Sequence, residues 1–135
     1  MRWRKKVDWG PRRLTRDEWA VLEALIEADD LDAVEYAIEE LTGFMDEFRE
    51  DVDGRPLIGV TDGQLAVLQE RRTSHRGTPV VSLTFCAAGP PGEADPHAFD
   101  RLSAAATSLV DHVQAEGVAV HGIRWVEHDP MPRPF

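Results

Sequence analysis

The sequence contains one cysteine and no long apolar run, and each shortage excludes a class of protein. Cys86 has no second cysteine with which to form an internal disulfide, so the chain is not a disulfide-stabilised secreted scaffold. No stretch approaches the ~20 apolar residues of a membrane-spanning helix, and no basic N-terminal region leads into the apolar segment of a signal peptide. We therefore expect a soluble, cytoplasmic protein with no membrane partner.

Cations are scarce in one segment. Residues 17–53 contain fifteen Asp and Glu residues but a single cation, Arg49. They carry a charge of −14, whereas residues 1–16 carry +6 and residues 54–135 carry −2. The net charge of −10 is therefore concentrated in one segment that follows a short basic arm. A block of acidic residues is typical either of a solvated surface or of a surface that binds a basic partner.

The remaining composition is that of one folded domain. A chain of 135 residues buries roughly two thirds of the surface that its unfolded form exposes. Its hydrophobic residues, 42% of the chain with four tryptophans, argue against a disordered protein. The sequence has no internal repeat and no long linker. We therefore expect residues 1–135 to form a single domain.

Residues 15–53 are predicted to form an acidic helical hairpin. Thr15 has the position of a helix cap, with a glutamate three residues later and an apolar stripe beyond it. Asp29 or Asp30 is then placed to cap a second helix. The apolar residues of this second helix recur at spacings of three and four, which predicts a helix that runs to about Arg49.

Residues 56–128 are predicted to form a β-β-β-α-β unit, whose first part admits two interpretations. An Asp-Gly turn predicts a hairpin in which Val60 pairs with Leu65. A capping box that begins at Thr61 predicts instead that residues 61–72 are helical. We favour the hairpin because its register matches apolar residues with apolar residues.

The second part of this unit has clearer signals. Residues 78–88 are β-branched and aromatic, which predicts a central strand. Asp95 is placed to cap a long helix that ends at Gly117. Residues 118–128 return as a strand, and residues 129–135 are expected to be a proline-rich tail.

The predicted fold class is α+β. An N-terminal helical hairpin precedes a mainly antiparallel sheet of three to five strands, with a long C-terminal helix packed on one face. Residues 1–14 form a basic arm or an edge strand in this scheme.

Acidic residues of the hairpin are the predicted binding surface. Asp32, Glu35 and Glu39 recur with no lysine four residues later, so they repel each other by about a few tenths of a kcal/mol per close pair. A surface selected only for solubility more easily mixes both signs, although a solvated helix face is the alternative interpretation. The predicted binding residues are Asp29, Asp30, Asp32, Glu35, Glu39, Glu40, Asp46 and Glu47.

These residues lead to a functional hypothesis. We expect a non-catalytic protein-interaction module that binds a basic protein partner through an acidic helical surface. An inhibitor of a nuclease, of the immunity-protein or antitoxin type, has this profile because its target is built to hold phosphates.

No metal, cofactor or nucleic acid is predicted. The five histidines form no i, i+4 pair on a helix face and no H-E-x-x-H motif. A calcium loop around Gly54 fails because Val60 stands where a bidentate glutamate is required. The basic arm has cations and aromatic rings that suit nucleic acid, but the adjacent acidic segment repels a polyanion. We expect the arm to dock on the acidic helices instead.

Two further hypotheses belong to other functional classes. One is a small ligand-binding or catalytic domain with a pocket between the sheet and the long helix, where Cys86, His97, His121 and Trp125 are the residues to inspect. The other is a homodimer built on an open sheet edge, for which the last strand and the tail are the candidates.

Overall fold

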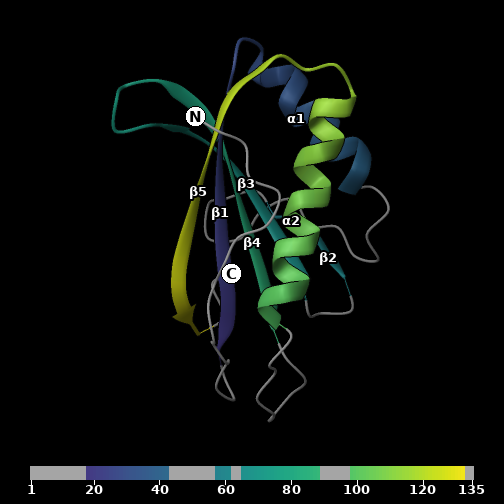
Figure 1. The fold of residues 1–135 in the computed structure, drawn as a ribbon, viewed down its shortest axis with the longest axis vertical. Helices are drawn as coiled ribbons and strands as arrows, with labels where there is room; N and C mark the ends of the chain where they lie inside the picture. The colour runs from purple at the N-terminus through teal and green to yellow at the C-terminus, as the bar shows by residue number, and fades with distance from the viewer. Residues whose placement is uncertain (1–17, 43–56, 62–64, 89–97, 133–135) are drawn as a thin grey trace.

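Five strands form one sheet in the computed structural model, which describes residues 18–42, 57–61, 65–88 and 98–132. Their order across the sheet is β2–β3–β4–β1–β5, and each pair is antiparallel (Figure 1). The strands are β1 (Trp19–Ala28), β2 (Leu57–Thr61), β3 (Leu65–Thr73), β4 (Pro79–Ala88) and β5 (Val120–Met131).

Both helices cover the same face of this sheet (Figure 1). They are α1 (Leu31–Thr42), which follows β1, and α2 (Ala98–Ala115), which precedes β5. The core lies between the helices and the sheet, because alternate residues of each strand point to this face. Its largest fully buried members are Phe85, Leu22, Ile26, Ile38, Leu83 and Leu102. No helix among the described residues is long and apolar enough to cross a membrane.

The predicted N-terminal helical hairpin is wrong, because residues 19–28 form β1. Pairs of adjacent apolar residues, such as Val21 and Leu22, imitate a helical stripe in the sequence. In the sheet they point to opposite faces, and both are buried. β1 is buried on both faces and pairs with β4 and β5, so contacts with distant segments override the local helical signals.

One local signal in this region is confirmed. Asp30 caps α1, since its Oδ1 accepts a hydrogen bond from the backbone N–H of Ala33 at 3.1 Å. α1 is described to Thr42, so the predicted extension to Arg49 lies outside the described residues, as do Thr15 and the basic arm.

The hairpin interpretation of residues 57–72 is confirmed, and the helical alternative is wrong, because these residues contribute β2 and β3. The register differs by one residue from the prediction: Val60 pairs with Ala66 and not with Leu65. A one-residue slip reverses the face to which every side chain points, so the register decides which residues of β3 face the helices.

The predictions for residues 78–135 are confirmed in part. β4 is the central strand of the sheet, as expected. A strand follows the long helix, as expected, so α2 is not C-terminal, and this strand, β5, runs through Met131 into the segment expected to be a tail. β5 and β2 are the outer strands among the described residues. The homodimer through the last strand stays a prediction.

Candidate functional site

On the face of the sheet opposite the helices, the buried strand β1 carries an acidic residue, Glu23. Ala24 and Ile26 of β1 pack in the core beneath the helices, so Glu23 and Leu25 point to the helix-free face. Glu23 is only 5% exposed. A carboxylate in such a place needs partners, because an unpaired buried charge costs several kcal/mol.

Three strands supply partners to the Glu23 carboxylate. Ser82 of β4, which is fully buried, donates a hydrogen bond to Oε2 at 2.5 Å. Arg72 of β3 forms an ion pair with the same oxygen at 2.6 Å, and His128 of β5 donates from Nε2 to Oε1 at 3.1 Å. The four side chains form one polar cluster that ties together the strands on both sides of β1.

This cluster determines the charge of Glu23. Burial by itself raises the pKa of the Glu23 carboxyl, because it disfavours the charged form. The hydrogen bonds from Ser82 and His128 and the positive charge of Arg72 outweigh burial, so the pKa lies below its usual value. Glu23 is therefore a carboxylate at neutral pH.

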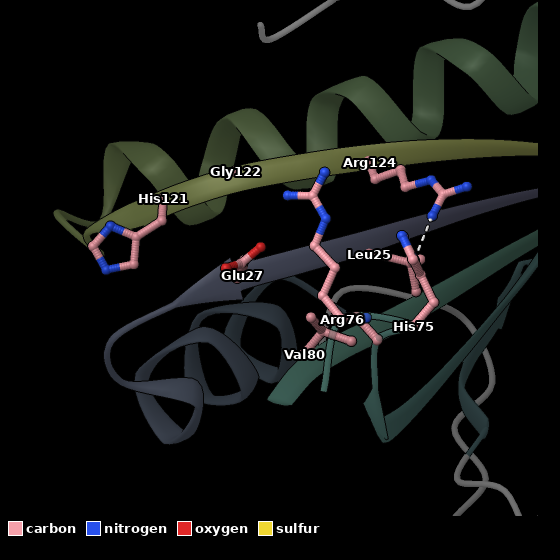
Figure 2. Close-up of a pocket in the computed structure, with 9 residues that line it drawn as sticks. Leu25, Glu27, His75, Arg76, Val80, His121, Gly122 and Arg124 are labelled. Carbon is pink, nitrogen blue, oxygen red and sulfur yellow. Dashed lines mark hydrogen bonds between the residues drawn. The ribbon is translucent and has the colours of Figure 1, made fainter. Parts of the chain in front are cut away.

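A groove lies beside this cluster, lined by residues of the β3–β4 hairpin and of β5 (Figure 2). β4 and β1 separate β3 from β5 in the sheet, yet His75 of the hairpin contacts β5. Its Nδ1 accepts a hydrogen bond from Nη1 of Arg124 at 3.1 Å (Figure 2). The hairpin tip therefore reaches across the helix-free face, and the hollow between it and β5 has a volume of about 620 Å³.

The hairpin tip is a defined turn. Ser74 donates its backbone N–H to the carbonyl of Thr78 at 2.8 Å and accepts the N–H of Gly77 at 2.8 Å. Gly77 has a φ of +80°, a conformation that glycine adopts without strain. The Ser74 hydroxyl also accepts the backbone N–H of Arg76 at 3.3 Å. The turn thus holds the backbone that carries Arg76 into the groove.

The walls of the groove are cationic and its floor is apolar. Arg76 and Arg124 line the groove together with the apolar residues Leu25 and Val80 (Figure 2). Among the described residues, the guanidinium of Arg76 has no hydrogen-bond or ion-pair partner, and that of Arg124 contacts only the imidazole of His75. The groove lining includes one carboxylate, the exposed Glu27. Two arginine charges therefore face the groove without being neutralised by a bound carboxylate.

A smaller hollow of about 250 Å³ connects this groove with the polar cluster. It shares Leu25 and Arg124 with the groove and is lined also by Glu23 and Arg72. Groove and cluster are therefore adjacent on the helix-free face.

The predicted acidic residues are partly neutralised within the molecule. Arg71 of β3 binds Asp32 at 2.5 Å and Glu35 at 2.6 Å. These bonds, first of all the one to Glu35, raise the pKa of Arg71 above its usual value. His121 donates from Nε2 to Asp29 at 2.5 Å, and this bond raises the pKa of the imidazole.

The other predicted binding residues have separate positions. Asp30 caps α1, whereas Glu39 and Glu40 are exposed on the same helix. Asp46 and Glu47 lie outside the described residues.

The residues named for a pocket between sheet and helix do not come together. Cys86 is fully buried in a small apolar cluster on the helix-free side. Trp125 packs against the core on the helical side, and His121 lines the groove. His97 lies outside the described residues. The groove itself lies on the face of the sheet opposite α2.

Sequence reasoning did not select the residues of this site. Glu23, Ser82 and Arg72 come from three segments whose proximity depends on the strand order. One signal was present, because Glu23 is the single polar residue within residues 19–26, and a buried acid at that position needs a partner. No protein-family model, curated protein or solved structure matches this chain.

Proposed function

We propose that this protein binds a small anionic ligand in the groove on the helix-free face, with Arg76 and Arg124 as the anion-binding groups. The observation that carries the proposal is the pair of arginines, which have no carboxylate partner among the described residues in a protein of net charge −10. Arginine side chains in such an acidic protein are expected to find carboxylates, as Arg71 and Arg72 do.

The lining defines the class of ligand. A guanidinium group offers several N–H donors in one plane and binds phosphate or carboxylate oxygens in a bidentate manner. Leu25 and Val80 supply an apolar floor, and about 620 Å³ lies within the range of small-molecule sites. The negative charge of the rest of the protein disfavours a polyanion. These features favour a small molecule with one anionic group and an apolar body.

Phenyl phosphate is a suitable probe because it combines both features. We expect a titration followed by amide NMR shifts to perturb the backbone around Arg76, Gly122 and Arg124, which line the groove. Each arginine-to-glutamine variant is expected to weaken binding about ten-fold or more, because a charge-assisted hydrogen bond contributes ~1.5–3 kcal/mol.

The matched control is Arg71→Gln, which removes the same charge from β3 on the helical side of the sheet. Arg71→Gln is expected to bind the probe like the wild type. Equal weakening by all three variants, or shifts spread over the helical side, would show that the groove is not the binding site. Inorganic phosphate, tested in parallel, measures the contribution of the anionic group alone.

A second candidate function keeps the hypothesis of a basic protein partner. Tyr36 on α1 is 70% exposed, and the acidic residues Asp32 and Glu40 lie one turn away on either side of it. Tyrosine is enriched in protein interfaces, where it contacts cations with its ring. An aromatic side chain framed by carboxylates on α1 favours a lysine- or arginine-rich partner.

This second function predicts binding that depends on both salt and the ring. Capture of a basic partner by the wild-type protein is expected to fall between low and high salt and to be lost in Tyr36→Ala. Arg76→Gln, on the other face of the sheet, serves as the control and should capture the partner normally. Salt-independent capture, or capture that Tyr36→Ala leaves unchanged, would contradict this function.

A further inference from the structure

The two helices bring three metal-ligating side chains together, away from the groove. Glu40 belongs to α1, His112 lies in the last turn of α2, and Glu116 directly follows the last residue of that helix. One ligand atom of each side chain lies within 4.8 Å of the other two. Within the part of the chain that the structure describes, these three side chains form a group that could hold a metal ion.

The imidazole of His112 supplies a second, independent observation. Its Nε2 atom is buried and has no hydrogen-bond partner among the residues that the structure describes. The Oε1 atom of Glu116 lies 3.7 Å from it, which is too long for a hydrogen bond. A buried ring nitrogen that lies near carboxylates without a hydrogen bond to them is unsatisfied. Because buried polar atoms normally have a partner, this one indicates a missing donor or a bound ion.

We propose that Glu40, His112 and Glu116 bind a divalent transition-metal ion, with Zn²⁺ as the preferred ion. Zinc–nitrogen and zinc–oxygen bonds of ~2.0–2.2 Å in tetrahedral geometry separate neighbouring ligand atoms by roughly 3.3 Å. The observed 3.7 Å between His112 and Glu116 is therefore close to the separation that a shared ion requires.

Charge and ligand chemistry agree with this assignment. Neither Glu40 nor Glu116 is paired with a lysine or arginine among the described residues, so an added cation relieves their mutual repulsion. His112 lies in the last turn of α2 and Glu116 directly follows the helix, where the helix dipole favours positive charge. The imidazole ligand favours zinc over calcium and magnesium, which prefer oxygen ligands alone. Both carboxylates are exposed, so a water molecule can complete the coordination.

The site is tested by titrating the full chain with Zn²⁺, using calorimetry for affinity and NMR of the histidine ring nitrogens for the position. We expect about one ion per chain and a large shift of the Nε2 resonance of His112. His112→Gln and Glu40→Gln are each expected to weaken zinc binding about ten-fold or more, because each removes one of three protein ligands. Magnesium at the same concentration is expected to leave the ring signals unchanged.

Two variants serve as controls. Glu39→Gln removes the same charge from the neighbouring position of α1, and His121→Gln removes a histidine that is bonded to Asp29 at a distance from the site. Both should bind zinc like the wild type. The proposal is overturned if His112→Gln and Glu40→Gln bind zinc within two-fold of the wild type, if another histidine shows the ring shift, or if millimolar zinc does not bind. Glu40 is exposed, so its variant folds even if His112→Gln does not.

Discussion

The Glu23 carboxylate offers the sharpest test of the polar cluster. Replacing it with glutamine keeps the shape of the side chain and removes its charge. The bond from buried Ser82 then changes from charge-assisted to neutral, which costs about 1 kcal/mol. The pairs with Arg72 and His128 are half-exposed and contribute below about 1 kcal/mol each. After the smaller desolvation of an amide is subtracted, we expect Glu23→Gln to reduce the free energy of unfolding by about 2 kcal/mol.

This loss depends on pH in a defined direction. The pKa of Glu23 in the folded protein lies below its usual value of 4.5, so its contribution is fully present above that value. The contribution disappears as the pH falls through the lower, folded-state pKa. Glutamine does not titrate. The difference in stability between wild type and Glu23→Gln is therefore expected to be largest at neutral pH and to shrink below about pH 4.5.

Urea unfolding at neutral pH and at several acidic pH values measures both effects. Glu27→Gln is the matched control, because Glu27 belongs to the same strand but is exposed. Its stability is expected to stay within about 0.5 kcal/mol of the wild type. A variant at Glu23 that is as stable as the wild type at pH 7, or a difference that does not change with pH, would refute the reasoning. The first result would mean that desolvation cancels the three partners, and the second would mean that the charge of Glu23 makes no net contribution to stability.

Three further predictions follow from contacts of single residues. Arg71→Gln is expected to lower the stability by about 0.5–1 kcal/mol in urea unfolding, because its two carboxylate partners on α1 are left to repel each other. An unchanged urea midpoint would show that these ion pairs do not stabilise the fold. Asp29→Asn is expected to lower the NMR-measured pKa of His121, because that bond raises it. The His121–Asp29 contact stabilises the wild type below the unfolded-state pKa of the imidazole, and this stabilisation is lost as the pH rises through the folded-state pKa. Equal titrations of His121 in the two proteins would contradict the contact. Gly117→Ala is expected to lower the stability by about 1 kcal/mol in thermal unfolding, because Gly117 has a φ of +83°. Nothing lies within 4 Å of an added Cβ, so the loss comes from backbone strain alone. An unchanged stability would show that this turn relaxes.

The β1 segment shows why part of the fold was not predictable. Its local signals, a capping pattern and closely spaced apolar residues, favour a helix. Its actual partners are β4 and β5, and residues 81–88 and 120–131 are far from it in the chain. A strand buried on both faces loses the apolar–polar alternation by which strands are recognised. The interrupting Glu23 then looks like the polar face of a helix, although it is the centre of a buried cluster.

The site was missed for a related reason. Arg76, Arg124 and His75 are unremarkable as sequence neighbours, and their chemistry arises only because the hairpin tip crosses the helix-free face to reach β5. His112 and Glu116 lie four residues apart and were available to sequence reasoning. Only the packing of α1 on α2 adds Glu40 to them.

The sequence by itself determined the features whose causes lie within a few residues. These are the cap of α1 by Asp30, the strand character of β4 and the end of α2 before Gly117. Tertiary structure alone decided that β1 is a strand, which face of the sheet carries Glu23, and which charges pair with one another among the described residues. Hydrogen bonds between strands and the burial of charge depend on segments far apart in the chain, and local sequence patterns carry no information about them.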